Sequence, residues 1–249
     1  MSVVIEKVQQ HYDDVADIYD SRYDRNKGRF YHAHISERVL EGMPHGGRIL
    51  DLGCGTGLFL KAYEDLGGYG VGLDLSREMI RRARMRCGES EFFIGNAEVL
   101  PFAEESFDAV ASLMAFSYVR RPDLLLAEAY RVLKPGGRIA ICTLGRNLLT
   151  TGLPAIYTMA ELMRLKKIGM GDFGEYYYGR SEMQDLLARS GFSSIRISKC
   201  SFAHLNLADP LFQLARKVEP FIEERVPRLA YNILAKGVKA GSPCSPHEK

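Results

Sequence analysis

Short apolar runs alternate with helix-like patterns through the middle of the chain. Five such runs are predicted as strands: 48–52, 69–75, 91–94, 107–115 and 138–144. Between them, helices are predicted at 58–66, from an N-cap at Ser76, and at 123–133 before the breaker Lys134-Pro135-Gly136-Gly137. Strands that alternate with helices form a parallel sheet covered on both faces.

The two ends of the chain have other patterns. Beyond residue 145 the apolar spacing predicts helices at 151–167, 181–189 and 210–226, and strands at 195–198 and 231–237. Before the alternating region, residues 8–20 have helical spacing, and Met43-Pro44-His45-Gly46-Gly47 breaks the chain. The tail 241–249 is rich in Gly, Ser and Pro, and we expect it to be disordered.

Composition narrows the function classes. The chain has 249 residues and a net charge of +2, so one α/β domain is the default and no basic footprint for nucleic acid is visible. The five cysteines lie at least 33 residues apart, which excludes CxxC metal spacing, and we expect no metal. No secretory signal and no run of ~20 apolar residues is present. We therefore expect a cytoplasmic protein without a transmembrane segment.

A glycine-rich turn follows the first predicted strand. In Asp51-Leu52-Gly53-Cys54-Gly55-Thr56-Gly57, three glycines permit a tight turn that a ligand can approach closely. The third glycine comes one position too early for the dinucleotide pattern, and the turn lacks the Gly-Lys-Ser/Thr of a phosphate-binding loop. Alone, the turn indicates only that some ligand could bind there.

An acid at the end of the next strand makes the ligand more specific. Asp74 stands about 20 residues downstream, where a ribose-binding carboxylate is expected. The competing interpretation is that Asp74 caps the following helix. Because Ser76 is itself a competent cap, we favour ribose binding.

Several segments together resemble one family. Residues 49–57 and Gly72-Leu73-Asp74 resemble the first two motifs of class I S-adenosylmethionine-dependent methyltransferases. Residues 95–108 and 128–138 are similar to later motifs of that family. The resemblance is close over 48–144, looser at 12–23 and 177–192, and points to the small-molecule type with a methyltransferase-11/25-like domain.

The resemblance implies a fold and a division of the chain. It implies an α/β, Rossmann-like sheet of seven mostly parallel strands with helices on both faces. It further implies an N-terminal helical lid at 1–47, a methyltransferase domain at 48–240 with a helical cap inserted after strand five at about 150–180, and the tail 241–249.

The resemblance also implies roles for individual residues, with S-adenosyl-L-methionine as cofactor and S-adenosyl-L-homocysteine as product. Amides around Gly53, Cys54, Gly55 and Gly57 would face its amino-acid end, and Asp51 would contact its ammonium. Asp74 would bind the ribose, while Leu75, Met79, Asn96 and Ala97 would hold the adenine. Position 96 is usually Asp in the family, but an Asn can accept through its carbonyl or donate to a ring nitrogen. Met114 and Tyr19 complete the expected cofactor site.

The expected acceptor is a small, lipophilic or aromatic molecule. The segment 112–119 is apolar and aromatic and lacks the Asn/Asp-Pro-Pro-Tyr/Phe pattern of enzymes that methylate amide or base nitrogens. A methyltransferase acting on RNA or protein, a non-catalytic module that binds the cofactor, and a nicotinamide oxidoreductase stay as alternatives. The near-neutral charge argues against nucleic acid as partner.

Methyl transfer does not dictate a catalytic residue, because a general base is needed only for some acceptors. The candidates are Tyr19, His11, Tyr118 and Tyr178, with packing as the competing role of each tyrosine. His32 and His34, two apart, are expected as solvated surface residues that share no metal.

Two surface features leave the partners open. The arginines of 77–86 are expected on the wet face of a helix. The amphipathic stretch 211–226 could cover the sheet, form a dimer face or touch a membrane surface, so both monomer and homodimer stay open.

Overall fold

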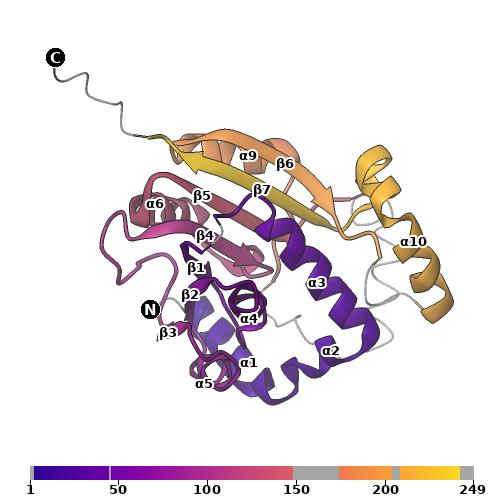
Figure 1. The fold of residues 1–249 in the computed structure, drawn as a ribbon, viewed down its shortest axis with the longest axis horizontal. Coiled ribbons are helices and arrows are strands. Elements are labelled where there is room, and N and C mark those ends of the chain that lie inside the picture. Colours follow the sequence, from indigo (N-terminus) through magenta and orange to yellow (C-terminus); the bar gives the residue numbers. More distant parts are fainter. Residues whose placement is uncertain (1–2, 45, 148–173, 204–207, 242–249) are drawn as a thin grey trace.

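The structure, a computed structural model, describes residues 3–44, 46–147, 174–203 and 208–241. Seven strands form one sheet in the order β3-β2-β1-β4-β5-β7-β6 (Figure 1). Their bounds are β1 Arg48–Leu52, β2 Tyr69–Asp74, β3 Glu91–Ile94, β4 Phe107–Leu113, β5 Leu133–Leu144, β6 Phe192–Cys200 and β7 Asn232–Lys239.

The sheet is parallel except at one edge, where β7 runs antiparallel to both β5 and β6. The prediction of seven mostly parallel strands is therefore confirmed. The strand order reverses between β1 and β4, which both leave the sheet at the same edge. In open α/β sheets, a crevice for ligands forms outside the carboxyl ends of the strands at such a reversal.

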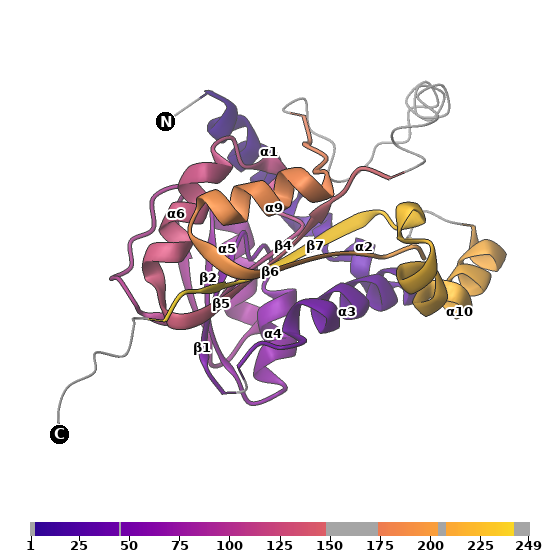
Figure 2. The ribbon, with the colours of Figure 1, turned by 90° about the horizontal axis from the view of Figure 1, so that it is seen from above.

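Helices cover both faces of the sheet (Figure 2). The described helices are α1 Val3–Tyr19, α2 Ser21–Asp24, α3 Asn26–Leu40, α4 Leu58–Glu64, α5 Arg77–Arg86, α6 Pro122–Val132, α9 Arg180–Arg189 and α10 Asp209–Arg225, with short 3-10 turns at Phe116–Tyr118 and Pro227–Leu229. Helices α3, α4 and α5 share one apolar core, and α6 and α9 share the other. No described helix is long and apolar enough to cross a membrane.

Helix α5 illustrates how the local sequence produces this layer. The hydroxyl of Ser76 accepts a hydrogen bond from the Met79 N–H at 3.1 Å, as an N-cap does. Met79, Ile80 and Ala83 then recur on one side of the helix and are buried. Both features agree with the sequence analysis.

Several strand boundaries differ from the prediction: β2 ends one residue earlier, at Asp74, β6 extends at both ends to Phe192–Cys200, and β7 spans Asn232–Lys239. The differences in β4 and β5 have a visible cause. β4 ends at Leu113, because Met114 takes a positive φ of 58° and leaves the extended conformation. β5 begins at Leu133, five residues earlier than predicted, since Leu133 pairs with Phe107 across a register shift. The breaker at 134–137 therefore lies in an irregular part of β5 instead of ending the helix in a separate loop.

The N-terminal segment has two structural roles. Helix α3 packs against β4 and β5 and belongs to an apolar core with Tyr31, Ile35 and Val39. Helix α1 lines the larger ligand pocket described below, and Tyr23 of α2 with His32 and Ile35 of α3 lines a second pocket beside it. The division that makes 1–47 a lid stays a prediction. The predicted helix at 151–167 and the tail 242–249 lie outside the described residues.

Candidate cofactor and acceptor site

A pocket lies at the carboxyl ends of β1, β2 and β4, and the space inside it, open solvent included, is about 920 Å³. Open α/β sheets bind their ligands at this position. Helix α1 covers one side with Val4, Ile5, Val8 and Tyr12. From the predicted cofactor set, the lining includes Tyr19, Gly53, Gly55, Asp74, Leu75, Met79, Asn96, Ala97 and Met114.

The glycine turn allows a close approach to the backbone. Gly53 and Gly55 have positive φ angles of 77° and 53°, which favour glycine. A Cβ on Gly53 would lie 2.2 Å from the Cβ of Ala115, so no other residue fits there without a shift. A Cβ on Gly55 would meet nothing within 4 Å, because this glycine borders the open pocket.

The glycine amides, however, bond inside the protein. The Gly53 N–H donates to the Leu73 carbonyl at 2.8 Å, and the Gly55 N–H donates to Asp74 Oδ2 at 2.9 Å. The Gly57 N–H donates to the Cys54 carbonyl at 3.0 Å. The turn therefore contributes close approach, and the donors of Gly53 and Gly55 orient β2 and Asp74. The predicted contact of these amides with the cofactor stays a prediction.

Gly57 has a different role from the other two glycines. It does not line the pocket, and a Cβ there would lie 3.1 Å from both Ala83 Cβ and Cys87 Sγ. Its φ of 79° also favours glycine. Gly57 therefore brings the start of α4 close to α5, which is a packing function and not the predicted contact with cofactor.

Asp51 is a buried acid, and the hydrogen bonding of its side chain is incomplete within the described residues. Its side chain is 1% exposed, and among the described residues Oδ1 has no hydrogen-bond partner. Burial and the charge of Asp74 raise the pKa of Asp51 to about 8. Asp51 and Cys54 line a second pocket that shares Tyr19, Gly53, Gly55, Leu113 and Met114 with the first. A cationic ligand group beside Asp51 would offset the cost of burying its negative charge. The ammonium of the predicted cofactor is such a group.

Asp74 is held in place by the backbone on both sides. Its Oδ2 accepts from Gly55 N–H, and its Oδ1 accepts from Ser76 N–H at 2.9 Å. Burial raises its pKa above the ordinary value. Each carboxylate oxygen keeps acceptor capacity beyond these bonds, so the side chain can still accept from ribose hydroxyls in the pocket that it lines.

Asn96 offers both kinds of hydrogen-bonding group at the pocket. Its carbonyl oxygen accepts from the Glu98 N–H at 2.9 Å and keeps a second lone pair, and its NH₂ supplies donors. An NH₂ donor suits a ring nitrogen of adenine, and the carbonyl suits its exocyclic amine. Both interactions expected for Asn96 therefore stay predictions.

Two acidic residues of α1, and Asp20 directly after it, fasten α1 to the body of the domain. Asp13 accepts from Ser76 Oγ at 2.5 Å, Asp17 pairs with Arg82, and Asp20 pairs with Arg86 at 2.6 Å. Asp20 also accepts from Thr56 Oγ1 at 2.6 Å. Arg82 and Arg86 are therefore not solvated surface charges as predicted, because they hold α1 over the pocket.

The catalytic candidates separate into two pairs. Tyr19 and Tyr118 line the pocket, and the ring of Tyr12 contacts both, at centroid distances of 6.2 and 5.8 Å. His11 packs edge-on against Tyr12 but does not line the pocket. Tyr178 is 3% exposed and packs against Phe116 in the core, so packing explains its position better than catalysis.

Glu175 is a site residue that the sequence analysis missed. The Tyr118 hydroxyl donates to Glu175 Oε1 at 2.7 Å. These residues are 57 positions apart, and Glu175 stands in a loop without periodicity. No local sequence signal could have joined it to the pocket.

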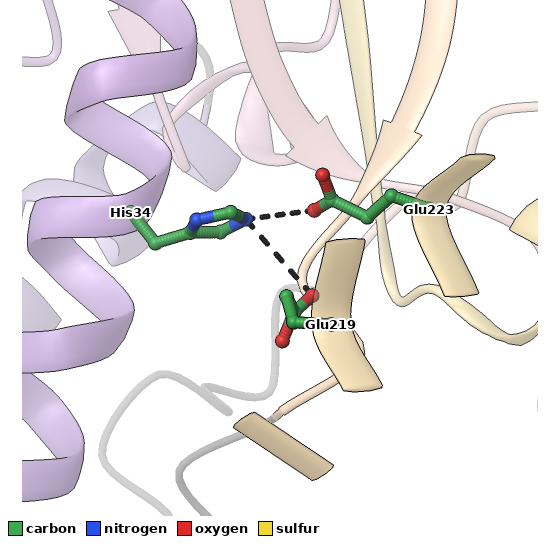
Figure 3. Close-up of side chains that lie close together, drawn as sticks. All are labelled: His34, Glu219 and Glu223. Carbon is green, nitrogen blue, oxygen red and sulfur yellow. Dashed lines mark hydrogen bonds and ion pairs between the residues drawn. The ribbon is translucent and has the colours of Figure 1, made fainter. Parts of the chain in front are cut away.

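The two histidines of α3 are not solvated as predicted. His32 packs on the ring of Tyr23 and lines the second pocket, and burial lowers its pKa to about 4. His34 Nε2 lies 2.7 Å from Glu223 Oε1 and 3.9 Å from Glu219 Oε1 (Figure 3). Burial opposes charge on His34, but the hydrogen bond and charge of Glu223, with the charge of Glu219, outweigh it and raise its pKa.

The cluster of His34, Glu219 and Glu223 has the residue types of a metal site. Its two carboxylates nevertheless accept hydrogen bonds from backbone N–H groups. Glu219 accepts from the Phe202 and Ala203 N–H groups at 2.5 and 2.6 Å, and Glu223 from Ser201 N–H at 2.9 Å. The arrangement joins α3, α10 and the end of β6, and these contacts account for it without a metal.

The structure is an open α/β fold with a pocket where such sheets bind their ligands, and comparison with known proteins gives the family. Residues 50–141 match the methyltransferase domain family. The chain is 33% identical over 203 residues to demethylmenaquinone methyltransferase of Clavibacter sepedonicus, across 74% of this chain and 78% of the relative. The chain therefore belongs to the family of S-adenosylmethionine-dependent methyltransferases.

Two further relatives match over shorter regions. Identity is 36% over 139 residues with demethylmenaquinone methyltransferase of Renibacterium salmoninarum, across 55% of this chain and 58% of that protein. It is 40% over 115 residues with malonyl-[acyl-carrier protein] O-methyltransferase of Erwinia pyrifoliae, across 45% and 44%. The chain thus spans about half the length of these two relatives.

The fold also matches a solved structure. The S-adenosylmethionine-dependent methyltransferase of Thermotoga maritima superposes with a TM-score of 0.67 at 21% identity, over 92% of this chain and 99% of that chain. At this identity, the likeness concerns the fold.

Proposed function

We propose that this protein transfers a methyl group from S-adenosyl-L-methionine to a small acceptor with a lipophilic or aromatic surface. The observation that carries the proposal is the site, in which Asp51, whose buried Oδ1 has no partner within the described parts of the chain, and an oriented Asp74 adjoin an apolar wall from α1. The cofactor would supply an electrophilic methyl group on a sulfonium. The chain's own residues would bind and align the two reactants.

The cofactor would lie along the carboxyl ends of β1 and β2. In this arrangement Asp51 compensates the ammonium, and Asp74 accepts from the ribose. The Asn96 NH₂ donates to the adenine, between the apolar side chains of Leu75 and Met79. The raised pKa of Asp51 supports a cationic neighbour, because such a group lowers the cost of ionising a buried carboxyl.

The acceptor side is mainly apolar. Val4, Ile5 and Val8 of α1 and Val119 line it, together with the rings of Tyr12 and Tyr118. Such a wall favours an apolar acceptor through removal of apolar surface from water. The relatives named for demethylmenaquinone and for malonyl-[acyl-carrier protein] are in keeping with an acceptor other than nucleic acid.

Calorimetry tests the cofactor. We expect S-adenosyl-L-homocysteine to bind and NAD not to bind, and Asp74→Ala to weaken the binding. Asp123→Asn is the control, because Asp123 is 65% exposed at the start of α6 and does not line the pocket. Selective binding of NAD would contradict the proposal.

Labelled cofactor and fractionated cell extract test the acceptor. We expect label in small-molecule or lipid fractions, identified by mass spectrometry. Label confined to polynucleotide or protein fractions would favour the RNA or protein alternative. Binding of cofactor without transfer to any fraction would favour a non-catalytic module.

A further inference from the structure

A tyrosine in the pocket is connected to a carboxylate behind it. Tyr118 lines the acceptor side and donates to Glu175 Oε1 at 2.7 Å. The second oxygen of Glu175 accepts from the Tyr177 hydroxyl at 3.3 Å. Glu175 itself does not line the pocket and is half-buried. A proton leaving the pocket at Tyr118 therefore has a carboxylate within one hydrogen bond.

Tyr118 is not suited to act as a base alone. Burial, followed by the neighbouring Tyr12 and Glu175, raises its pKa well above the ordinary value of a tyrosine. The phenol is therefore neutral at physiological pH and cannot remove a proton as a phenolate. A neutral hydroxyl that donates to a carboxylate can instead accept a proton while it passes its own onward.

We propose that Tyr118 and Glu175 form a proton relay that deprotonates the hydroxyl of a phenolic acceptor during methyl transfer. The proposal rests on the proposed function and deepens it, since it names the acceptor class. Tyr118 would be the catalytic residue and Glu175 a positioning residue that acts through it.

The step balances in atoms and charge. The acceptor oxygen bonds to the methyl carbon as the carbon–sulfur bond of the cofactor breaks and its electron pair stays on sulfur. The acceptor proton moves to the Tyr118 oxygen, and the Tyr118 proton moves to Glu175. The sulfonium charge is lost, and the carboxylate becomes a neutral acid that later releases its proton to water.

A phenolic acceptor fits both parts of the pocket. Its ring suits the apolar and aromatic wall of Tyr12, Val8 and Val119. Its hydroxyl is protonated at neutral pH, with a pKa near that of tyrosine, about 10, so it gains from a base. The titratable or charged groups around the relay are Tyr12, Arg22, Asp74 and Tyr177.

The test compares two acceptors of different acidity, 1-naphthol and 4-nitro-1-naphthol, with labelled S-adenosyl-L-methionine. For 1-naphthol at neutral pH, we expect Glu175→Gln and Tyr118→Phe to lower kcat by about 10²-fold or more, the usual contribution of a general base. For the nitro compound, which is already ionised, the loss should shrink to a few-fold. The Glu175→Gln deficit with 1-naphthol should likewise close as the pH rises from about 6 to about 9, because solvent then ionises the acceptor.

Tyr176→Phe is the matched control. Its hydroxyl donates to Glu182 in the first turn of α9, as Tyr118 donates to Glu175, but Tyr176 does not line the pocket. We expect it to leave both rates unchanged. Thermal unfolding and S-adenosyl-L-homocysteine affinity report on folding and on the cofactor site in every variant.

The outcomes separate this inference from the proposed function. Equal losses for both naphthols, or a deficit that does not depend on pH, would mean a structural role and overturn the relay. A wild-type protein that binds S-adenosyl-L-homocysteine but methylates neither naphthol would overturn the phenolic acceptor and leave the methyltransferase proposal standing. A wild-type protein that does not bind S-adenosyl-L-homocysteine would overturn both.

Discussion

The Gly55 N–H donates to Asp74 Oδ2 at 2.9 Å, and this bond joins the glycine turn after β1 to the acid at the end of β2. Two sequence features 19 residues apart thereby become one site. The turn gives access to the ligand, and its amide holds the carboxylate that would bind the ribose.

Removal of the Asp74 carboxylate should affect binding more than folding. Asp74→Ala loses acceptors for the Gly55 and Ser76 amides and for the ribose. A hydrogen bond to a charged group contributes about 1.5–3 kcal/mol, so we expect at least about a tenfold loss of S-adenosyl-L-homocysteine affinity by calorimetry. Asp74→Asn keeps one acceptor and should lose less. Equal affinity of Asp74→Ala and wild type would exclude a ribose contact.

Cofactor affinity should depend on the ionisation of Asp51. The pKa of Asp51 is raised to about 8 without a ligand, so at pH 7 the carboxyl is mostly protonated. Binding of an ammonium would require its ionisation, and the proton would be released to solvent. We therefore expect the S-adenosyl-L-homocysteine affinity to fall as the pH falls from about 8 to about 6.

Calorimetry in buffers of different ionisation enthalpy measures this released proton. Asp51→Asn should bind more weakly and lose both the proton release and the pH dependence. Proton release that persists in Asp51→Asn would assign it to another group. The ligand-free protein should also become less stable as the pH rises from about 4 to about 8, since the unfolded Asp51 releases its proton first.

The acidic residues that fasten α1 should set how long the cofactor stays bound. Asp20 bonds to Arg86 and to Thr56, and both bonds hold α1 over the pocket. We expect Asp20→Ala and Arg86→Ala to speed the release of S-adenosyl-L-homocysteine in stopped-flow measurements by about 10- to 100-fold, given the usual strength of hydrogen bonds to charged groups. Arg81→Ala is the control, because Arg81 forms its ion pair with Glu78 of its own helix and does not fasten α1 to the domain. Additive effects of the Asp20 and Arg86 variants would contradict a direct coupling.

The two glycines of the turn should respond differently to alanine. At Gly57 a Cβ would meet Ala83 and Cys87 at 3.1 Å, and the left-handed conformation alone costs about 1–2 kcal/mol. Gly57→Ala should therefore lower the free energy of unfolding by more than that conformational cost. Gly55→Ala carries a similar conformational cost at its φ of 53°, but its Cβ would meet no atom within 4 Å, so it should destabilise less and chiefly weaken S-adenosyl-L-homocysteine binding. Denaturant unfolding and calorimetry separate the two, and the reverse pattern would contradict the assignment.

Much of the fold and part of the site could be predicted because the signals are local. Alternating strands and helices, the Ser76 cap and the positions of Asp51 and Asp74 follow from residues near one another in sequence. The partners of the glycine amides could not be predicted, because Leu73 and Asp74 approach only when β1 and β2 pair.

The same reason explains the other errors. The sequence predicts Arg82 and Arg86 as solvated charges, because it does not show that α1 packs beside α5. In the structure this packing brings Asp17 and Asp20 to the two arginines. Glu175 joins the pocket through a contact across 57 residues, and His34 meets α10 across 189. The separation of such residues along the sequence follows no recognisable pattern, since the tertiary fold alone brings them together.

Two histidines on one helix should give opposite dependences of stability on pH. The pKa of His34 is raised in the folded protein by Glu223 and Glu219 against the effect of burial. Its contribution to stability is therefore present below the unfolded pKa of about 6.5 and is lost as the pH rises through the folded value. The pKa of His32 is lowered by burial to about 4, so its contribution is present above about 6.5 and is lost as the pH falls toward 4.

Urea unfolding of His34→Gln and His32→Gln over about pH 5 to 9 measures how each histidine contributes to the pH dependence of the free energy of unfolding. Relative to wild type, His34→Gln should lose the most stability at the acidic end, where the protonated imidazole pairs with the carboxylates. His32→Gln should remove a decline that the wild type has below about pH 6.5. Because the two side chains share helix α3, general damage to that helix would shift both variants equally at every pH. Opposite slopes would assign the cluster in Figure 3 to a charged clamp between α3 and α10, and parallel curves would reject it.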